Sequence, residues 1–251
     1  MSGLKRRLGP ISILGLAAVF VILGMAGCGS IGSLKLPGAG AAAPGRSDKG
    51  WWYASFKINW PQDEDLALDT DLLIAHRIIS PVLDRYKKDI PLWRFHRRAV
   101  RDDAGHRFSF IFYTSAATAR KIYAAIDSSA VLKLMRAEGV ITKVLFDDIN
   151  SNQRPCIESA SDPGWSVPIQ KAWPYFIMGV SQTWLDLISQ YADDGRTKPV
   201  SPAEMQAFYR EISQEVESTW KNEGGHAFLH HLNALFGYGP VNLRGKIEMN
   251  F

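Results

Sequence analysis

The stretch from Trp51 to Phe146 switches between two hydrophobic periods, and this switching limits the folds open to the chain. From Trp52 to Trp60 an apolar side chain occupies every second position, which predicts a half-buried strand over 51–60. Apolar side chains three and four positions apart predict helices over 65–88 and 115–135. Pro81 predicts a kink or a restart within the first of these helices. Three further apolar stretches predict strands over 93–100, 106–113 and 140–146.

The expected order is therefore strand, helix, strand, strand, helix, strand. Residues 101–105 join the second and third strands and end in Gly105, which is typical of a hairpin loop. This order is that of the ferredoxin-like arrangement, in which four antiparallel strands carry two helices on one face. We predict an α+β fold with a ferredoxin-like domain over 51–150.

After residue 150 the pattern becomes helical, and we predict a helical unit with a terminal strand over 151–251. Ser201-Pro202-Ala203-Glu204 is a capping box with proline at the first helical position. The last eleven residues alternate between apolar and polar, which predicts an edge strand or a strand donated to a partner. The expected elements are a connection over 150–171, helices over 173–191 and from 202 to Gly224-Gly225, a shorter helix over 226–236, and a strand over 241–251.

Residues 1–27 have the pattern of a secretory signal peptide. Lys5-Arg6-Arg7 precede the apolar run Ile11–Met25, which is shorter than the roughly 20 residues of a membrane-spanning helix. The run ends in Met25-Ala26-Gly27-Cys28, which resembles the lipobox of bacterial lipoproteins. This resemblance implies cleavage before Cys28 and acyl chains such as palmitate on the mature cysteine. An uncleaved anchor helix with an incidental cysteine is the alternative, and it also tethers the chain.

Residues 28–50 are rich in glycine, alanine, serine and proline, which predicts a flexible lipidated linker. Such a linker has an average reach of roughly 25 Å. In enterobacteria an aspartate after the lipidated cysteine retains lipoproteins in the inner membrane, whereas this chain has Gly29. We therefore expect a location in the bacterial cell envelope, lipid-anchored to the outer membrane and facing the periplasm.

The charge balance argues against nucleic-acid binding. The formal net charge is +4, but without Lys5, Arg6 and Arg7 the chain has 26 basic and 25 acidic residues. Nucleic-acid binding would need a clustered excess of positive charge. The expected partners are therefore the membrane, through the lipid, and a protein of the envelope.

The chain has two cysteines, so a lipid on Cys28 leaves Cys156 without a disulfide partner. The fold must then rest on its core. Cys156 is either buried or, in the loop that Arg154 and Pro155 suggest, available for an intermolecular bond.

The densest group of basic residues lies on and beside the strands expected over 93–100 and 106–113. The candidate ligand-binding residues there are Arg94, His96, Arg97, Arg98, His106 and Arg107. Alternation places Arg94, His96 and Arg98 on one strand face and Arg97 on the other. Guanidinium groups on an open face could grip a carboxylate or a phosphate. The alternative is a solvated face, balanced by Asp102, Asp103, Asp147 and Asp148.

The same region resembles the C-terminal domain of lantibiotic dehydratases and of the related thiopeptide-type bacteriocin biosynthesis proteins. The residues that carry the resemblance are Trp52-Tyr53, Ile79-Ser80-Pro81-Val82-Leu83, Trp93-Arg94-Phe95-His96-Arg97-Arg98 and Gly105-His106-Arg107-Phe108. The family eliminates glutamate from modified peptides, and the resemblance places Arg97 and His106 at its basic residue and its histidine. Those enzymes are cytosolic, whereas this chain is expected to be exported, so the resemblance implies shape more than catalysis.

His226, His230 and His231 form an H-x-x-x-H-H pattern in which the first two would share a helix face. Ala227 stands where the zinc-protease pattern has glutamate, and no third ligand is evident, so we expect no metal site and no cofactor. We assign no catalytic residue. The expected function is that of a non-enzymatic accessory, binding or assembly module. The alternative is a peptide-binding or peptide-processing domain that uses the basic Arg/His face with Arg97 and His106.

Overall fold

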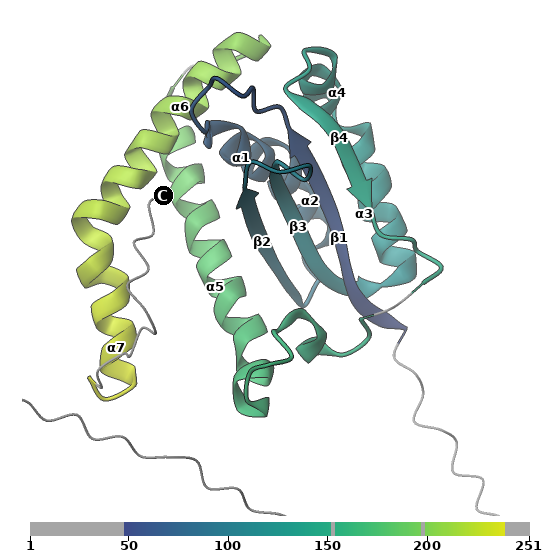
Figure 1. The fold of residues 1–251 in the computed structure, drawn as a ribbon, viewed down its shortest axis with the longest axis vertical. Helices are drawn as coiled ribbons and strands as arrows, with labels where there is room; N and C mark the ends of the chain where they lie inside the picture. The colour runs from purple at the N-terminus through teal and green to yellow at the C-terminus, as the bar shows by residue number, and fades with distance from the viewer. Residues whose placement is uncertain (1–47, 152–153, 197–198, 239–251) are drawn as a thin grey trace, which may run out of the picture. The chain divides into compact units, whose positions relative to one another are not determined.

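Four antiparallel strands form the central sheet, in the order β2-β3-β1-β4 (Figure 1). The computed structural model describes residues 48–151, 154–196 and 199–238. The strands are β1 (Lys49–Ile58), β2 (Leu92–Ala99), β3 (His106–Ser115) and β4 (Ile141–Phe146). Each bound lies within two residues of its prediction, and the mixed α/β class is confirmed.

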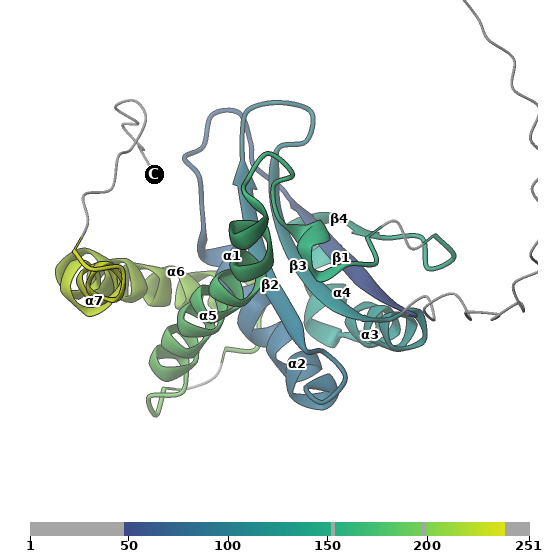
Figure 2. The ribbon, with the colours of Figure 1, turned by 90° about the horizontal axis from the view of Figure 1, so that it is seen from below.

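Helices from two parts of the chain cover one face of the sheet, and Figure 2 shows α2, α3 and α4 on the same side. The first helical stretch consists of α1 (Asp69–Leu73), the π-helical turn η1 (Ile74–Ile79) and α2 (Ser80–Tyr86). The second consists of α3 (Ala116–Ser128) and α4 (Ala130–Ala137). Ser129 separates α3 from α4, because its backbone leaves the helical region and its hydroxyl accepts from Leu132 N–H. The prediction of one helix over 115–135 was wrong at this point.

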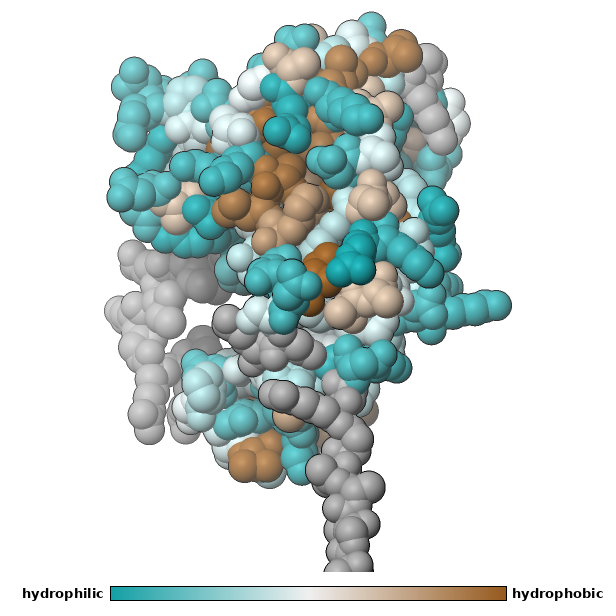
Figure 3. Space-filling view, turned by 90° about the vertical axis from the view of Figure 1, so that its right-hand side faces the viewer, coloured by the Kyte–Doolittle hydropathy of each residue, from teal (hydrophilic) through white to brown (hydrophobic). Residues whose placement is uncertain are grey.

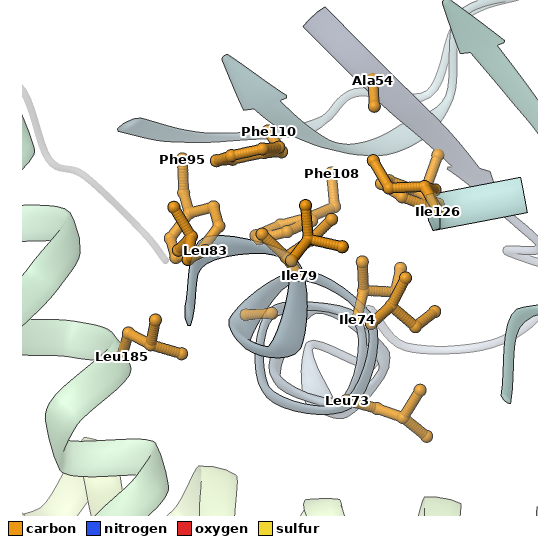
Figure 4. Close-up of a cluster of buried hydrophobic side chains, with 14 of the residues drawn as sticks. Ala54, Leu73, Ile74, Ile79, Leu83, Phe95, Phe108, Phe110, Ile126 and Leu185 are labelled. Carbon is orange, nitrogen blue, oxygen red and sulfur yellow. The ribbon is translucent and has the colours of Figure 1, made fainter. Parts of the chain in front are cut away.

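The main core lies between the sheet and these helices (Figure 4). Trp52, Ala54, Phe56 and Ile58 on β1 all point into it, as the alternation predicts. Neighbouring strands contribute Trp93, Phe95, Phe108, Phe110 and Phe112, and the helices contribute a largely aliphatic set that includes Leu73, Ile74, Ile79 and Ile126. Apolar side chains of α4 and β4 pack around this core, and the side of the molecule that they occupy shows apolar patches between hydrophilic side chains (Figure 3).

The second half of the chain adds two long helices, α5 (Val167–Ala192) and α6 (Pro202–Thr219). Helix α5 lies along the edge strand β2, where Phe95 N–H donates to Ser181 Oγ (3.1 Å). Leu185 and Ile188 of α5 and Ile212 of α6 belong to the same core cluster as the sheet residues. The predicted capping box is present at Ser201 and Glu204.

Helix α6 does not end at Gly224-Gly225, which corrects the prediction of a separate third helix. It continues through the π-helical stretch η3 (Trp220–His230) into α7 (His231–Leu235). Gly224 has a packing reason for lacking a side chain, since a Cβ there would lie 2.7 Å from the indole of Trp220. Glycine weakens a helix by about 1 kcal/mol relative to alanine, which continuous packing can outweigh.

Two of the predicted segments lie outside the described residues: the leader with most of the linker (residues 1–47) and the terminal strand over 241–251. Within the described ranges, none of the helices is both long enough and apolar enough to span a bilayer.

Candidate functional site

Strand pairing brings four basic residues into one row across the sheet face that carries no helices over this region. Arg98 on β2 lies opposite Arg107 on β3, and Arg107 lies opposite Lys57 on β1. Lys57 in turn lies opposite Lys143 on β4. We call these four residues the cationic row. Lys57 and Arg107 point away from the main core, because their neighbours Phe56 and Phe108 point into it, and the pairing register places Arg98 and Lys143 on the same face.

The hairpin loop between β2 and β3 holds most of the cationic row in place. Arg98 Nη1 donates to Asp102 Oδ1 (2.9 Å), and this contact holds the pKa of the Asp102 carboxyl well below its usual range. Arg107 Nε donates to the Ala104 carbonyl (3.0 Å), and Lys57 Nζ donates to the Asp103 carbonyl (3.0 Å). Carbonyl groups orient these cations without neutralising them.

Three charges of the cationic row have no acidic partner in the part of the chain that the structure describes. Arg98 forms an ion pair with Asp102, whereas Arg107, Lys57 and Lys143 form none. Like charges directly opposite one another destabilise a sheet. The electrostatic energy of the cationic row is therefore unfavourable by itself, and a bound anion would make it favourable.

His96 and Arg94 follow the cationic row along β2 on the same face. Burial, and then the charges of Arg94 and Arg98, lower the pKa of the His96 imidazole. The Arg94 guanidinium stacks over Trp173 of α5, 4.9 Å from the ring centre. Burial and then repulsion from Arg154 lower the pKa of Arg94 to about 10, so it stays charged at neutral pH. Its Nε makes no hydrogen bond to any residue that the structure describes.

Arg97 and His106 lie on the opposite, helix-covered face, where both approach one carboxylate. Arg97 Nε donates to Asp71 Oδ2 (2.7 Å), and His106 Nε2 lies 2.9 Å from Asp71 Oδ1. The second approach is too poorly aligned for a hydrogen bond. The Asp71 side chain is fully buried and that of His106 is 1% exposed. These residues join α1 to the sheet.

The six predicted ligand residues are thus divided between two faces: Arg94, His96, Arg98 and Arg107 share the open face with one another, and Arg97 and His106 do not. Sequence reasoning missed Lys57 and Lys143, because only the pairing register brings them beside Arg107. It also missed Asp71. The one sequence feature that could have indicated this residue is the position of its carboxylate directly before the apolar run Leu72-Leu73-Ile74.

A surface pocket of about 190 Å³ adjoins the cationic row at the end of β1, and its lining includes Lys57, Asn59, Gln62, Arg101 and Thr142. Arg101 is fixed beside it, because its guanidinium stacks 3.4 Å over the Trp60 ring and donates to the Pro61 carbonyl (2.8 Å). The pocket extends the polar surface beyond Lys57.

The weak metal candidates His226 and His230 stack with their ring centres 5.1 Å apart, and His231 lies close by. Among the described residues, no group of three or more His, Cys, Asp or Glu side chains could hold a metal ion. Cys156 is a free, exposed thiol in the connection before α5, so the buried alternative was wrong. Cys28 lies outside the described residues.

Comparison with protein-family models, with curated proteins and with solved structures finds no match to this chain. The lipobox and the resemblance to lantibiotic dehydratases both stay predictions from sequence.

Proposed function

We propose that this chain is a lipoprotein anchored through Cys28 whose globular part is a non-enzymatic binding module. In this proposal the cationic row grips the carboxylates of an acidic segment in a protein partner of the cell envelope. The observation that carries the proposal is the register Arg98–Arg107–Lys57–Lys143, which sets four cations side by side with one carboxylate among them.

The chemistry of the row suits a peptide carboxylate. Guanidinium groups bind carboxylates through paired hydrogen bonds, and Arg107 keeps its terminal nitrogens available because its contact to the loop uses Nε. Lys57 and Lys143 add charges that attract without a fixed geometry. Acidic residues elsewhere in the sequence balance these charges, so the net charge of the chain without its leader is near zero although the cationic row is positive.

We also propose that the sheet and its covering helices form a ferredoxin-like domain. The support is the order of the elements along the chain, strand, helix, strand, strand, helix, strand, together with the strand order β2-β3-β1-β4 and antiparallel pairing throughout. In such a domain the sheet face away from α2, α3 and α4 is the surface that remains for a ligand, and here it is open where the cationic row crosses it.

The anchoring part of the proposal rests on sequence. The basic residues before the apolar run, its short length and its end at Met25-Ala26-Gly27-Cys28 support cleavage and acylation, and Gly29 supports the outer membrane. An envelope location is consistent with a binding partner that is itself a protein.

The test measures the binding of a fluorescent glutamate-rich peptide to the full-length chain in detergent, with a glutamine-rich peptide of equal length for comparison. We expect the triple variant Lys57→Gln/Arg107→Gln/Lys143→Gln to bind the glutamate peptide at least about tenfold more weakly, since each charged contact contributes more than 1 kcal/mol. The control Arg120→Gln/Lys121→Gln/Lys133→Gln removes equal charge from α3 and α4. Equal weakening in both triple variants would show a general charge effect and would contradict a site at the row.

A further inference from the structure

The first half of α5 and the connection before it expose a set of large apolar side chains. Trp165, Val167, Ile169, Tyr175, Phe176 and Val180 are each 40–60% exposed. We call these six residues the apolar end. Ile169, Phe176 and Val180 are seven and four positions apart, so they share one side of the helix. The neighbouring helices leave this side open, since Ile169, Phe176 and Val180 each keep about half of their surface exposed.

The apolar end lies where the chain enters the sheet. Trp51, near the start of β1, donates from its backbone N–H to the Arg154 carbonyl and from its indole to the Ile157 carbonyl (2.9 Å each). The connection then closes on α5, because Ser161 Oγ donates to the Gln170 carbonyl (2.7 Å). Figure 1 shows the start of β1 and the start of α5 at the same, lower end of the molecule.

The cationic row lies at the other end of the same strand. β1 begins at Lys49 and reaches Lys57 one residue before its last. The connection and the start of α5 therefore lie toward one end of β1, and the cationic row lies toward its other end. One end adjoins the chain that leads back to Cys28, and the other carries the unpaired positive charges.

We propose that the apolar end docks onto the surface of the lipid bilayer, with its aromatic side chains in the interfacial layer. This inference rests on the proposed function, because the lipid on Cys28 is what brings the domain to a membrane. A linker with the composition of residues 28–48 is expected to reach roughly 25 Å on average, which would keep this end of the domain near the bilayer. Indole and phenol rings with an apolar body and a polar edge are the side chains most enriched at membrane interfaces.

Docking of this kind is apolar and not electrostatic. Lys171 on α5 and Asp162 in the connection are exposed charges of opposite sign, and Arg94 lies against Trp173, which in turn contacts Trp165. The six exposed side chains of the apolar end are themselves uncharged, so we expect neutral phosphatidylcholine to be a sufficient surface. Binding at the cationic row, in contrast, weakens with salt.

The test uses the full-length lipidated protein in phosphatidylcholine vesicles and measures tryptophan quenching by brominated acyl chains. We expect a clear loss of fluorescence in the wild type, and we expect most of that loss to disappear in Trp165→Phe, which keeps the surface apolar but removes the reporter. Ile169→Ser/Phe176→Ser should also lose the quenching while still floating with the vesicles. The control Val100→Ser/Val200→Ser changes exposed apolar residues outside the apolar end and should behave as wild type.

Three other results would contradict either the docking of the apolar end or the lipid anchor. Equal quenching in the wild type and Trp165→Phe, at wild-type flotation, would overturn the docking and leave the anchor intact. A protein that fails to float, with Cys28→Ser indistinguishable from wild type, would overturn the anchor. Shielding of Trp165 from aqueous acrylamide that grows with protein concentration and needs no vesicles would show that a second copy covers the apolar end. Circular dichroism of each variant confirms that the fold is retained.

Discussion

Asp71 Oδ1 and His106 Nε2 lie 2.9 Å apart in a place where neither side chain meets solvent. Asp71 also accepts from Arg97, so one buried carboxylate joins α1 to both β2 and β3. An aspartate with this burial is tolerated because it has a charged partner.

Removal of Asp71 should destabilise the fold. We expect Asp71→Ala to lower the free energy of unfolding by about 3 kcal/mol, the lower end for breaking a buried ion pair, because Arg97 can turn toward water. Urea unfolding measures this loss. Asp102→Ala is the matched control, since it removes an exposed carboxylate that also pairs with an arginine, and its loss should be much smaller. Similar losses in both variants would show that Asp71 has no special structural role.

The pKa of His96 should make peptide binding depend on pH. Because burial and neighbouring arginines lower this pKa, the unfolded chain binds more protons between the lowered value and the usual value of about 6.5. Stability therefore falls as the pH falls through this window. A bound carboxylate favours the imidazolium and raises the pKa, so we expect the glutamate peptide to bind more tightly at a pH of about 5.5 than at about 7.5.

Nuclear magnetic resonance titration of the His96 ring protons, with and without the peptide, measures this shift directly. His96→Gln is the control and should flatten the pH dependence of binding. A His96 pKa that does not move on addition of the peptide would place the bound carboxylates elsewhere.

Gly224 and Gly225 should respond in opposite ways to alanine. A Cβ at Gly225 meets nothing within 4 Å, so Gly225→Ala should stabilise the helix by up to about 1 kcal/mol. At Gly224 the new methyl group would press on the Trp220 ring, which stacks on Phe228 (ring centres 6.2 Å apart), so the gain should be lost or reversed. Thermal unfolding followed at 222 nm compares the two variants. An equal gain at both positions would mean that Trp220 moves aside at no cost.

Acylation can be tested at Cys28 alone. We expect labelled palmitate to enter the wild-type chain in a bacterial host and to be absent from Cys28→Ser, which should leave the membrane fraction. Cys156→Ser, the other cysteine variant, should remain labelled and membrane-bound. If Cys28→Ser stays in the membrane, the apolar run Ile11–Met25 acts as an uncleaved anchor instead.

Local patterns were sufficient to predict the strands and their buried faces. Alternation along β1 has to place Trp52, Ala54, Phe56 and Ile58 together, because successive side chains of a strand point to opposite faces. The same rule is enough to separate Arg97 from Arg94, His96 and Arg98. Helix continuity was harder to predict, since packing beside Gly224 outweighs the weak helix propensity of glycine.

The candidate site could not be assembled from local patterns. Lys57 and Lys143 are 86 residues apart in the sequence, and only the pairing register of β1 with β4 makes them neighbours. The structural role of Asp71 likewise depends on Arg97 and His106, which contact it from two different strands. The exposure of Cys156 depends on how the connection lies over β1, which composition does not determine.

The central position of β1 has a mechanical consequence. This strand is paired along both edges, to β3 over its full length and to β4 over its second half. A lipid that holds the chain before Lys49 and a partner that pulls at Lys57 would load β1 lengthwise over roughly 26 Å, at about 3.3 Å per residue. Such a pull shears all the ladder hydrogen bonds of β1 together instead of opening them one by one. Under the proposed function, β1 is therefore the strand best placed to carry tension between the anchor and the partner.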